Sequence, residues 1–310
     1  MNKIILFLLC FLLGSSFSTF AQGRDREIKI SRQQESPVKT VKVRGKGKIK
    51  NVVFMIGDGM SLAHMYSTWA ANKGKLNLEN CQTVGLAKTY CYDRLITDSG
   101  AAGTALATGH KTRYHAVGVD PEGKPLLTLT DLAAAKSKST GVVVTCRLND
   151  ATPAAFCAHN SDRDQAEELI ADYAGCGVDF IFGGGKRYFC ERKDGRNILE
   201  EMKALGYQTP ENQEQLDAIQ TGKVLAVWAD HDLPRPSVRK EMLTESTMKA
   251  LELLSQNKKG FFLMVEASQI DDYGHANQLD PLVEEILDFD RTIGKVFEWA
   301  AADGETLVVV

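Results

Sequence analysis

Short apolar runs that alternate with amphipathic segments constrain the fold of this chain more than any other feature. Runs rich in β-branched and aromatic residues lie at 51–56, 142–145, 180–182, 224–228, 261–265 and 307–310. Runs of this length and composition predict buried strands. Segments with apolar residues at helical spacing lie at 127–136, 164–173, 240–255 and 282–300. This alternation predicts an α/β fold with a largely parallel central sheet and helices on both faces.

The first 21 residues differ in character from the rest of the chain. A short positive start at 1–3 precedes the apolar run 4–13, and small residues follow up to Ala21. This order predicts a secretory signal peptide cut after Ala21, because the run is too short to span a bilayer comfortably. A lipoprotein signal at Cys10 is the alternative, although Leu9 stands where a small residue is expected. We expect a secreted or periplasmic protein without stable membrane insertion.

Residues 22–48 are polar and basic, and we expect them to form a solvated leader before a catalytic domain at 49–310. The net charge of -3 argues against a nucleic-acid partner, since such domains are clearly basic. Seven cysteines include Cys10, and the even number that remains permits disulfides in an oxidising compartment. Cys176 and Cys190 flank a glycine-rich turn and are the first candidate pair. Buried free thiols are the alternative.

An acidic residue follows the first predicted strand. Asp58 stands between two glycines in the sequence IGDGM at 56–60. Flanking glycines allow the backbone to turn sharply and present a carboxylate. In parallel sheets such groups gather at the carboxyl edge, where ligands bind. An ordinary strand-to-helix turn is the alternative.

A serine followed by small residues indicates the start of a helix. Ser99 follows Asp98 in the sequence DSGAAGTALATG at 98–109. A helix beginning here would offer backbone N–H groups and a positive dipole end to a phosphate facing Ser99. The alternative is a serine that only caps the helix.

Four ionisable side chains follow the most apolar run, in the sequence VEASQIDDYGH at 265–275. Asp271 and His275 are four residues apart, so one helical turn brings them together as a zinc pair. Glu266 offers a hard oxygen suited to magnesium. Asp272 adds a further negative charge. A solvated loop is the alternative.

The segment after the run at 142–145 contains oxygen donors and an arginine. Asp150 and Thr152, in DATPAA at 150–155, could contact a metal or its waters. Arg163 offers a planar fork that matches two phosphate oxygens. We expect His159 to have a structural role.

The four motifs, in this order and spacing, resemble the alkaline phosphatase family over residues 49–310. The resemblance implies that Ser99 is the nucleophile that forms a phosphoserine intermediate. It implies that Arg163 clamps the phosphate and that Asp98 steadies Arg163. Asp150 matches a position near the water around magnesium. The implied substrates are small phosphate monoesters, and because relatives are commonly dimers, a homodimer is a candidate assembly.

The resemblance also implies two Zn²⁺ ions and one Mg²⁺ ion. Asp58 would bridge one zinc and the magnesium, and Ser99 would bind that zinc. Thr152 and Glu266 would complete the protein ligands of magnesium. Asp271 and His275 would bind the other zinc.

The sequence departs from the family pattern in two places. Relatives carry a Thr-Ala-Asp-His stretch directly after the strand that 306–310 resembles, and a further histidine downstream, but His275 is the last histidine here. We therefore expect a fold that is incomplete at its C-terminus, with the chain corresponding to the N-terminal two-thirds of a longer active form. Asp272 stands where some relatives carry Lys or His, which is expected to weaken phosphate affinity or change metal preference.

Two other kinds of function remain open. A phosphodiesterase, sulfatase or mutase of the same superfamily is one, although Ser99 in its motif and Arg163 favour a phosphomonoesterase. An inactive fragment that binds metal or phosphate is the other.

Overall fold

The computed structural model describes residues 35–42, 45 and 47–310. The predicted signal peptide at 1–21 and most of the predicted leader lie outside the described residues. None of the helices in the described part of the chain has the length and apolar character that a membrane crossing requires.

The centre of the fold is a seven-stranded sheet in the order β4-β5-β3-β2-β6-β1-β7. Its strands are β1 (Asn51–Gly57), β2 (Ser139–Arg147), β3 (Phe180–Gly184), β4 (Tyr207–Gln208), β5 (Lys223–Val227), β6 (Phe261–Ala267) and β7 (Thr306–Val309). Every neighbouring pair is parallel. The six predicted strands are all present, and the predicted parallel α/β fold is confirmed. The short edge strand β4 was not predicted.

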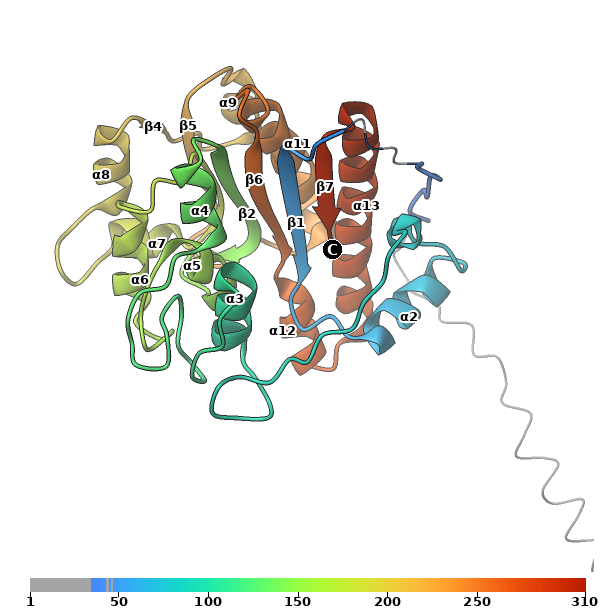
Figure 1. The fold of residues 1–310 in the computed structure, drawn as a ribbon, viewed down its shortest axis with the longest axis horizontal. Coiled ribbons are helices and arrows are strands. Elements are labelled where there is room, and N and C mark those ends of the chain that lie inside the picture. The colour runs from blue at the N-terminus through green and yellow to red at the C-terminus, as the bar shows by residue number, and fades with distance from the viewer. Residues whose placement is uncertain (1–34, 43–44, 46) are drawn as a thin grey trace, which may run out of the picture. The chain divides into compact units, whose positions relative to one another are not determined.

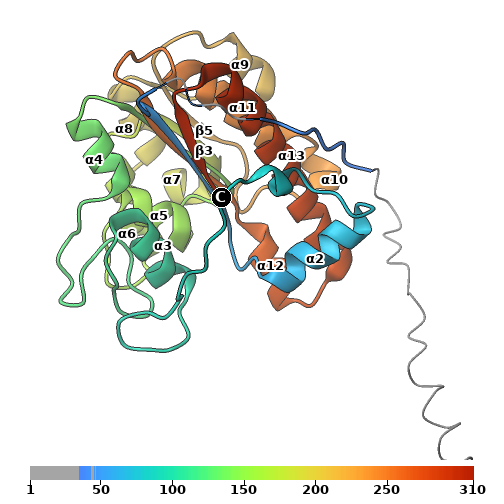
Figure 2. The same ribbon diagram turned by 45° about the vertical axis from the view of Figure 1, so that its right-hand side comes forward.

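Helices cover both faces of the sheet. They are α2 (Leu62–Ala71), α3 (Ser99–Thr108), α4 (Leu129–Ala135), α5 (Ala151–Cys157), α6 (Ala166–Tyr173), α7 (Lys186–Cys190), α8 (Ile198–Ala204), α9 (Gln213–Ala218), α10 (Pro236–Arg239), α11 (Met242–Leu254), α12 (Gln269–His275), α13 (Leu279–Asp303) and the 3-10 helix η1 (Asn77–Asn80). In Figure 2 the sheet is seen nearly edge-on, with α3 to α6 on one side and α11 and α13 on the other.

Local chemistry sets the ends of these helices. Thr128 caps α4 by accepting from the Asp131 N–H, and Asp131 accepts from Thr128 in return. Helices α3 and α13 end at Gly109 and Gly304, which have left-handed backbone with φ of 75° and 77°. The sequence thus encodes both starts and stops.

Side-chain alternation along the strands directs alternate residues toward the α3–α6 layer. Val142 and Val144 of β2, and Phe262 and Met264 of β6, belong to the core cluster on this side. The same alternation continues to Glu266, so a carboxylate at the end of β6 follows two buried apolar residues. This face leads into the site described below.

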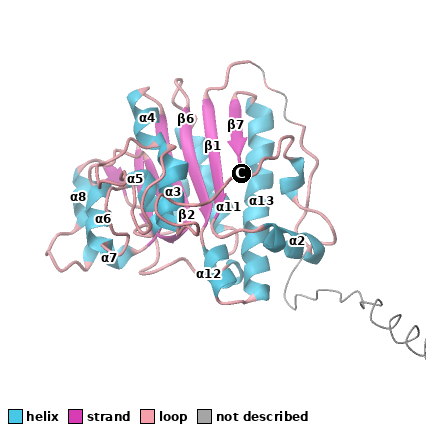
Figure 3. Cartoon of the chain, turned by 60° about the horizontal axis from the view of Figure 1, so that its bottom comes forward, coloured by secondary structure: helices cyan, strands magenta, loops and turns pink. Residues whose placement is uncertain are grey.

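The strands end at a common edge. Figure 1 shows β1 and β6 pointing toward the same edge, where α12 lies, and Figure 3 brings this edge forward. Register fixes the alignment, because Glu266 of β6 pairs with Ile56 of β1 and with Val144 of β2. Residues that follow these strands therefore lie close together.

The described part of the leader is not simply solvated. Ser36 is buried, and its backbone exchanges two hydrogen bonds with the Asn72 side chain. Asn77 and Asn80 bind the backbone of 37–41 in the same way. Backbone groups within 36–41 therefore contact the side chains of Asn72, Asn77 and Asn80.

The six cysteines at 81, 91, 146, 157, 176 and 190 are free thiols. The candidate pair Cys176–Cys190 is therefore wrong. The Cys176 thiol instead interacts with the Cys157 thiol of α5, and this interaction lowers the pKa of Cys176.

Candidate active site

Ser99 is the first residue of α3, and Asp98 is its cap. The Asp98 carboxylate accepts from the N–H groups of Gly100 and Ala101 at 3.0 and 3.2 Å. The alternative that Ser99 caps the helix is therefore wrong. Ser99 Oγ instead donates to Asp58 Oδ2 and Oδ1 at 3.0 and 3.2 Å. The two residues, 41 positions apart, meet at one edge of the sheet.

Asp58 lies in a tight turn directly after β1. Gly59 has a φ of 61°, and a Cβ at this position would collide with Oδ1 of Asp271. Only glycine allows the backbone to approach Asp271 this closely without strain. The turn therefore brings the carboxylates of Asp58 and Asp271 to the same side of the sheet.

Like charge and burial act together on Asp58. Burial raises its pKa to about 6, and the nearby charge of Asp271 adds to the rise. The Ser99 hydrogen bond opposes this shift only in part. Burial and like charge therefore both disfavour the ionised form of Asp58.

Glu266 is the most buried carboxylate of the site, with 1% of its surface exposed. Burial and the charge of Asp58 raise its pKa well above the usual range. Its Oε1 atom has no hydrogen-bond donor in the described part of the chain. Thr152 of α5 lies beside the same group, with its hydroxyl 3.5 Å from Asp58 Oδ2.

Arg163 lies between two carboxylates. Its guanidinium donates to Asp98 Oδ2 and to Asp150 Oδ1, each at 3.0 Å. Burial raises the pKa of Asp98, but N–H donors from His115 and Ala101, together with Arg163, hold it below its ordinary value. Asp150 also accepts from the Ala151 N–H at the start of α5.

Asp271 and His275 lie on one face of α12, as their spacing predicts. Their side chains are 3.3 Å apart, and the His275 side chain is 81% exposed. Asp272 lies beside them, and burial and the charges of Asp232 and Asp150 raise its pKa. This part of the site is the most open to solvent.

The structure also adds two residues that sequence analysis missed. Arg147 ends β2 and pairs with Asp150 at 3.0 Å and with Asp232 at 3.1 Å. Both lie at or after a strand end, which is the signal that could have identified them. The ring of His159, for which we expect a structural role, contacts the Leu126 carbonyl at 3.0 Å.

The donor set fits divalent cations. Asp58, Glu266 and Asp271 are acidic groups in mutual repulsion, and Glu266 Oε1 is buried without a donor. Carboxylates and a hydroxyl suit magnesium, while carboxylate plus imidazole suits zinc. Bound cations would offset the burial and the repulsion that raise these pKa values.

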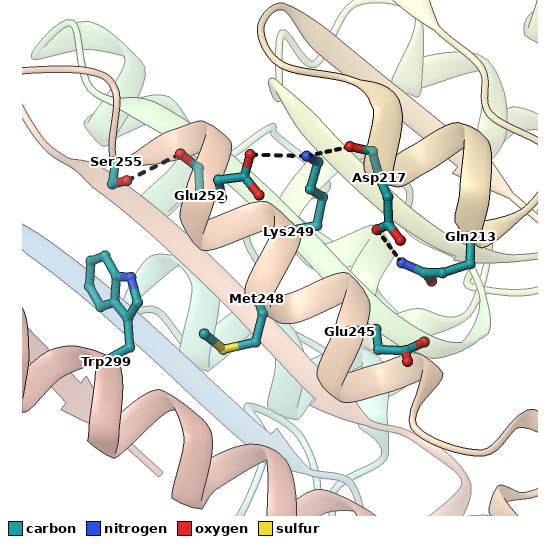
Figure 4. A pocket seen from close by; sticks show the side chains of 8 residues that line it. All are labelled: Gln213, Asp217, Glu245, Met248, Lys249, Glu252, Ser255 and Trp299. Carbon is teal, nitrogen blue, oxygen red and sulfur yellow. Dashed lines mark hydrogen bonds and ion pairs between the residues drawn. The ribbon is translucent and has the colours of Figure 1, made fainter.

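Two pockets differ in their relation to this edge. One of about 420 Å³ includes Arg147, Asp150 and Arg163 in its lining and opens beside the site. The other, of about 570 Å³, lies between α9, α11 and the C-terminal part of α13, and its lining includes Lys249 and Trp299. Figure 4 shows this second pocket, which contains none of the site residues named above.

Comparison with known proteins places these residues in context. The family model described as alkaline phosphatase matches residues 49–310. Alkaline phosphatase 4 of Bacillus subtilis is 37% identical over 89% of this chain and 63% of its own length. Streptomycin-6-phosphate phosphatase of Streptomyces griseus is 31% identical over 86% of this chain and 73% of its own length.

Solved structures agree in fold. The alkaline phosphatase of the Antarctic bacterium TAB5 has a TM-score of 0.82 and 35% identity, covering 84% of this chain and 78% of that one. A variant of the TAB5 enzyme with Mg bound in a site named M3 has a TM-score of 0.80 and 34% identity, covering 86% and 77%. The chain spans only 63% and 66% of the length of two Bacillus subtilis alkaline phosphatases that it resembles.

Proposed function

Because this chain belongs to the alkaline phosphatase family, we propose that it hydrolyses phosphate monoesters through a phosphoserine intermediate on Ser99. The observation that carries the proposal is the placement of Ser99. Its Oγ lies at the start of α3, bonded to Asp58, while Arg163 is held beside the same helix by Asp98.

Groups of this chain serve the binding of phosphate and its transfer to Ser99. Arg163 and the N–H groups at the start of α3 bind the phosphoryl oxygens and hold phosphorus in front of Ser99. Ser99 Oγ loses its proton and forms a bond to phosphorus, the ester bond breaks with its electron pair on the alcohol oxygen, and that oxygen takes up a proton to leave as the alcohol. Water then attacks phosphorus, inorganic phosphate leaves, and the Ser99 hydroxyl is restored.

Two Zn²⁺ ions and one Mg²⁺ ion are the proposed cofactors. Asp58, Thr152 and Glu266 would hold magnesium, Asp58 and Ser99 would hold one zinc, and Asp271 and His275 would contribute to the other. When bound, these ions supply positive charge that lowers the pKa of the Ser99 hydroxyl and stabilises the phosphoryl and leaving oxygens.

The remaining proposals follow the family. Small phosphate monoesters are the proposed substrates, and the name of the streptomycin-6-phosphate phosphatase supports a sugar-like leaving group as one member of that class. We further propose export through the N-terminal signal, and a homodimer as the assembly.

Hydrolysis of a chromogenic phosphate monoester by this chain, with zinc and magnesium present, tests the proposal. Ser99→Ala should reduce the rate by at least about a thousandfold, because it removes the nucleophile. Ser67→Ala is the matched control, since Ser67 bonds only within α2. Acid-quenched protein should carry phosphate on Ser99. A parent chain that binds phosphate without turnover would instead favour the alternative of an inactive fragment that binds phosphate.

A further inference from the structure

Charged side chains of alternating sign form a continuous row beside the site. From Asp98 the row passes to Arg163 at 3.0 Å and then to Asp150 at 3.0 Å. It continues from Asp150 to Arg147 at 3.0 Å and ends at Asp232, 3.1 Å from Arg147. The row links the proposed phosphate ligand to residues that have no part in the proposed chemistry.

The outer end of the row is anchored by backbone. Arg147 is the last residue of β2, and its N–H donates to Asp232 Oδ1 at 2.8 Å. Its guanidinium donates to both oxygens of Asp232, at 3.2 and 3.1 Å. Asp232 lies in the segment after β5, so the row joins two strand ends.

Asp150 is divided between the two arginines. Its Oδ1 accepts from Arg163, and its Oδ2 pairs with Arg147. The side chains of Asp150, Arg147 and Asp232 are 21%, 34% and 29% exposed, so water screens them less than a surface pair. A change in the strength of one ion pair therefore changes the strength of the next.

We propose that Arg147 and Asp232 set the phosphate affinity of Arg163 through Asp150. The inference rests on the proposed function, in which Arg163 binds phosphate. Arg147 neutralises part of the negative charge of Asp150. Asp150 therefore neutralises less of the positive charge of Arg163, which leaves that guanidinium a stronger phosphate ligand. Asp232 in turn pairs with Arg147 and weakens the ion pair between Arg147 and Asp150. Both are positioning residues that act through Asp150.

The alternation predicts effects of opposite sign. In Arg147→Gln, Asp150 forms an ion pair with Arg163 alone and neutralises more of its charge. Inorganic phosphate should then bind roughly threefold to tenfold more weakly. In Asp232→Asn, Arg147 turns more fully to Asp150, and phosphate should bind about twofold to fivefold more tightly. A role confined to folding would weaken binding in both variants.

Long-range charge alone would give the same signs, so a second measurement must separate the two explanations. In an Asp150→Asn background, both effects should fall below about twofold, because the connecting carboxylate is gone. Arg187→Gln removes an equal charge nearby, from a side chain that contacts His231 at 3.2 Å, and should change affinity by less than about twofold.

The experiment is equilibrium binding of radiolabelled inorganic phosphate to the full chain with zinc and magnesium, with circular dichroism as a check of folding. Opposite shifts that vanish in the Asp150→Asn background support the proposal. Shifts of the same sign, or shifts that persist in that background, overturn it while leaving the phosphate site intact. No binding by the parent chain would overturn the phosphate site itself, and the inference with it.

Discussion

The site has two parts with opposite electrostatics: a phosphate half, formed by Asp98 and Arg163, and a metal half, formed by Asp58, Glu266 and Asp271. In the phosphate half, Asp98 and Arg163 alternate in charge, and backbone N–H donors keep the pKa of Asp98 below its ordinary value. In the metal half, burial raises the pKa values of Asp58 and Glu266, and the charge of Asp271 on Asp58 and of Asp58 on Glu266 adds to the rise.

The difference shows which part of the site the chain positions without bound cations. Hydrogen bonds and ion pairs within the chain already position the phosphate half. The metal half is assembled against repulsion and burial, which folding tolerates because apolar packing elsewhere supplies the stability. Bound cations would therefore change the metal half much more than the phosphate half.

The largest effect is expected from adding magnesium and removing it with EDTA. At about a thousand times its dissociation constant, Mg²⁺ stabilises by about 4 kcal/mol, which raises Tm on the order of 10 °C. Glu266→Gln should abolish most of this shift, because it replaces the buried, charged carboxylate by a neutral amide. Thermal unfolding measures both. Glu201→Gln, at a partly exposed position of α8, serves as control, and an equal shift in Glu266→Gln would contradict the magnesium assignment.

Next in size is the pH dependence of the metal-free protein. The pKa of Asp58 rises from 3.8 in the unfolded chain to about 6 in the fold. The folded state therefore holds this proton between those values, and stability falls as pH rises from about 4 to 6. At about 1.4 kcal/mol per unit the loss approaches roughly 3 kcal/mol.

Urea unfolding in EDTA at several pH values measures this decline. Asp58→Asn has no such proton, so its stability should fall less over the same interval. Identical pH profiles for the two proteins would mean that Asp58 is not the source.

A smaller effect is expected at the turn that joins Asp58 to Asp271. Gly59→Ala adds a Cβ against Asp271 at a left-handed position, and should cost about 2 kcal/mol of stability and roughly tenfold in zinc affinity. Gly109→Ala is the matched control, since its φ is 75° but its Cβ would meet open space. Equal losses in the two variants would assign the effect to backbone strain alone.

The smallest effect distinguishes capping from charge in the phosphate half. Asp98→Asn keeps a good helix cap but removes the ion pair with Arg163, whereas Asp98→Ala removes both. Asp98→Ala should therefore be about 1 kcal/mol less stable than Asp98→Asn in urea unfolding. Equal stabilities would show that the cap contributes little to α3.

Much of the fold was predictable because its signals are local. The β-branched runs predicted six strands of the seven, and only the two-residue β4 was too short to give a pattern. Asp271 and His275 met because one helical turn joins them. Arg147 and Asp232 each follow or end a strand, but their pairing across a sequence separation of 85 residues has no local signal. The cysteine pair was chosen wrongly because a nearby glycine-rich turn does not show where the two thiols lie in space.

The sequence by itself determined the strand and helix periods, the glycine turns and the four motifs, since each depends on neighbours within a few residues. Tertiary structure alone decided that Ser99 donates to Asp58 rather than capping its helix. It also decided that Asp150 is shared between Arg163 and Arg147. The physical reason is that sheet register brings strand ends together, and charges interact according to distance in space and to burial, neither of which a linear pattern contains.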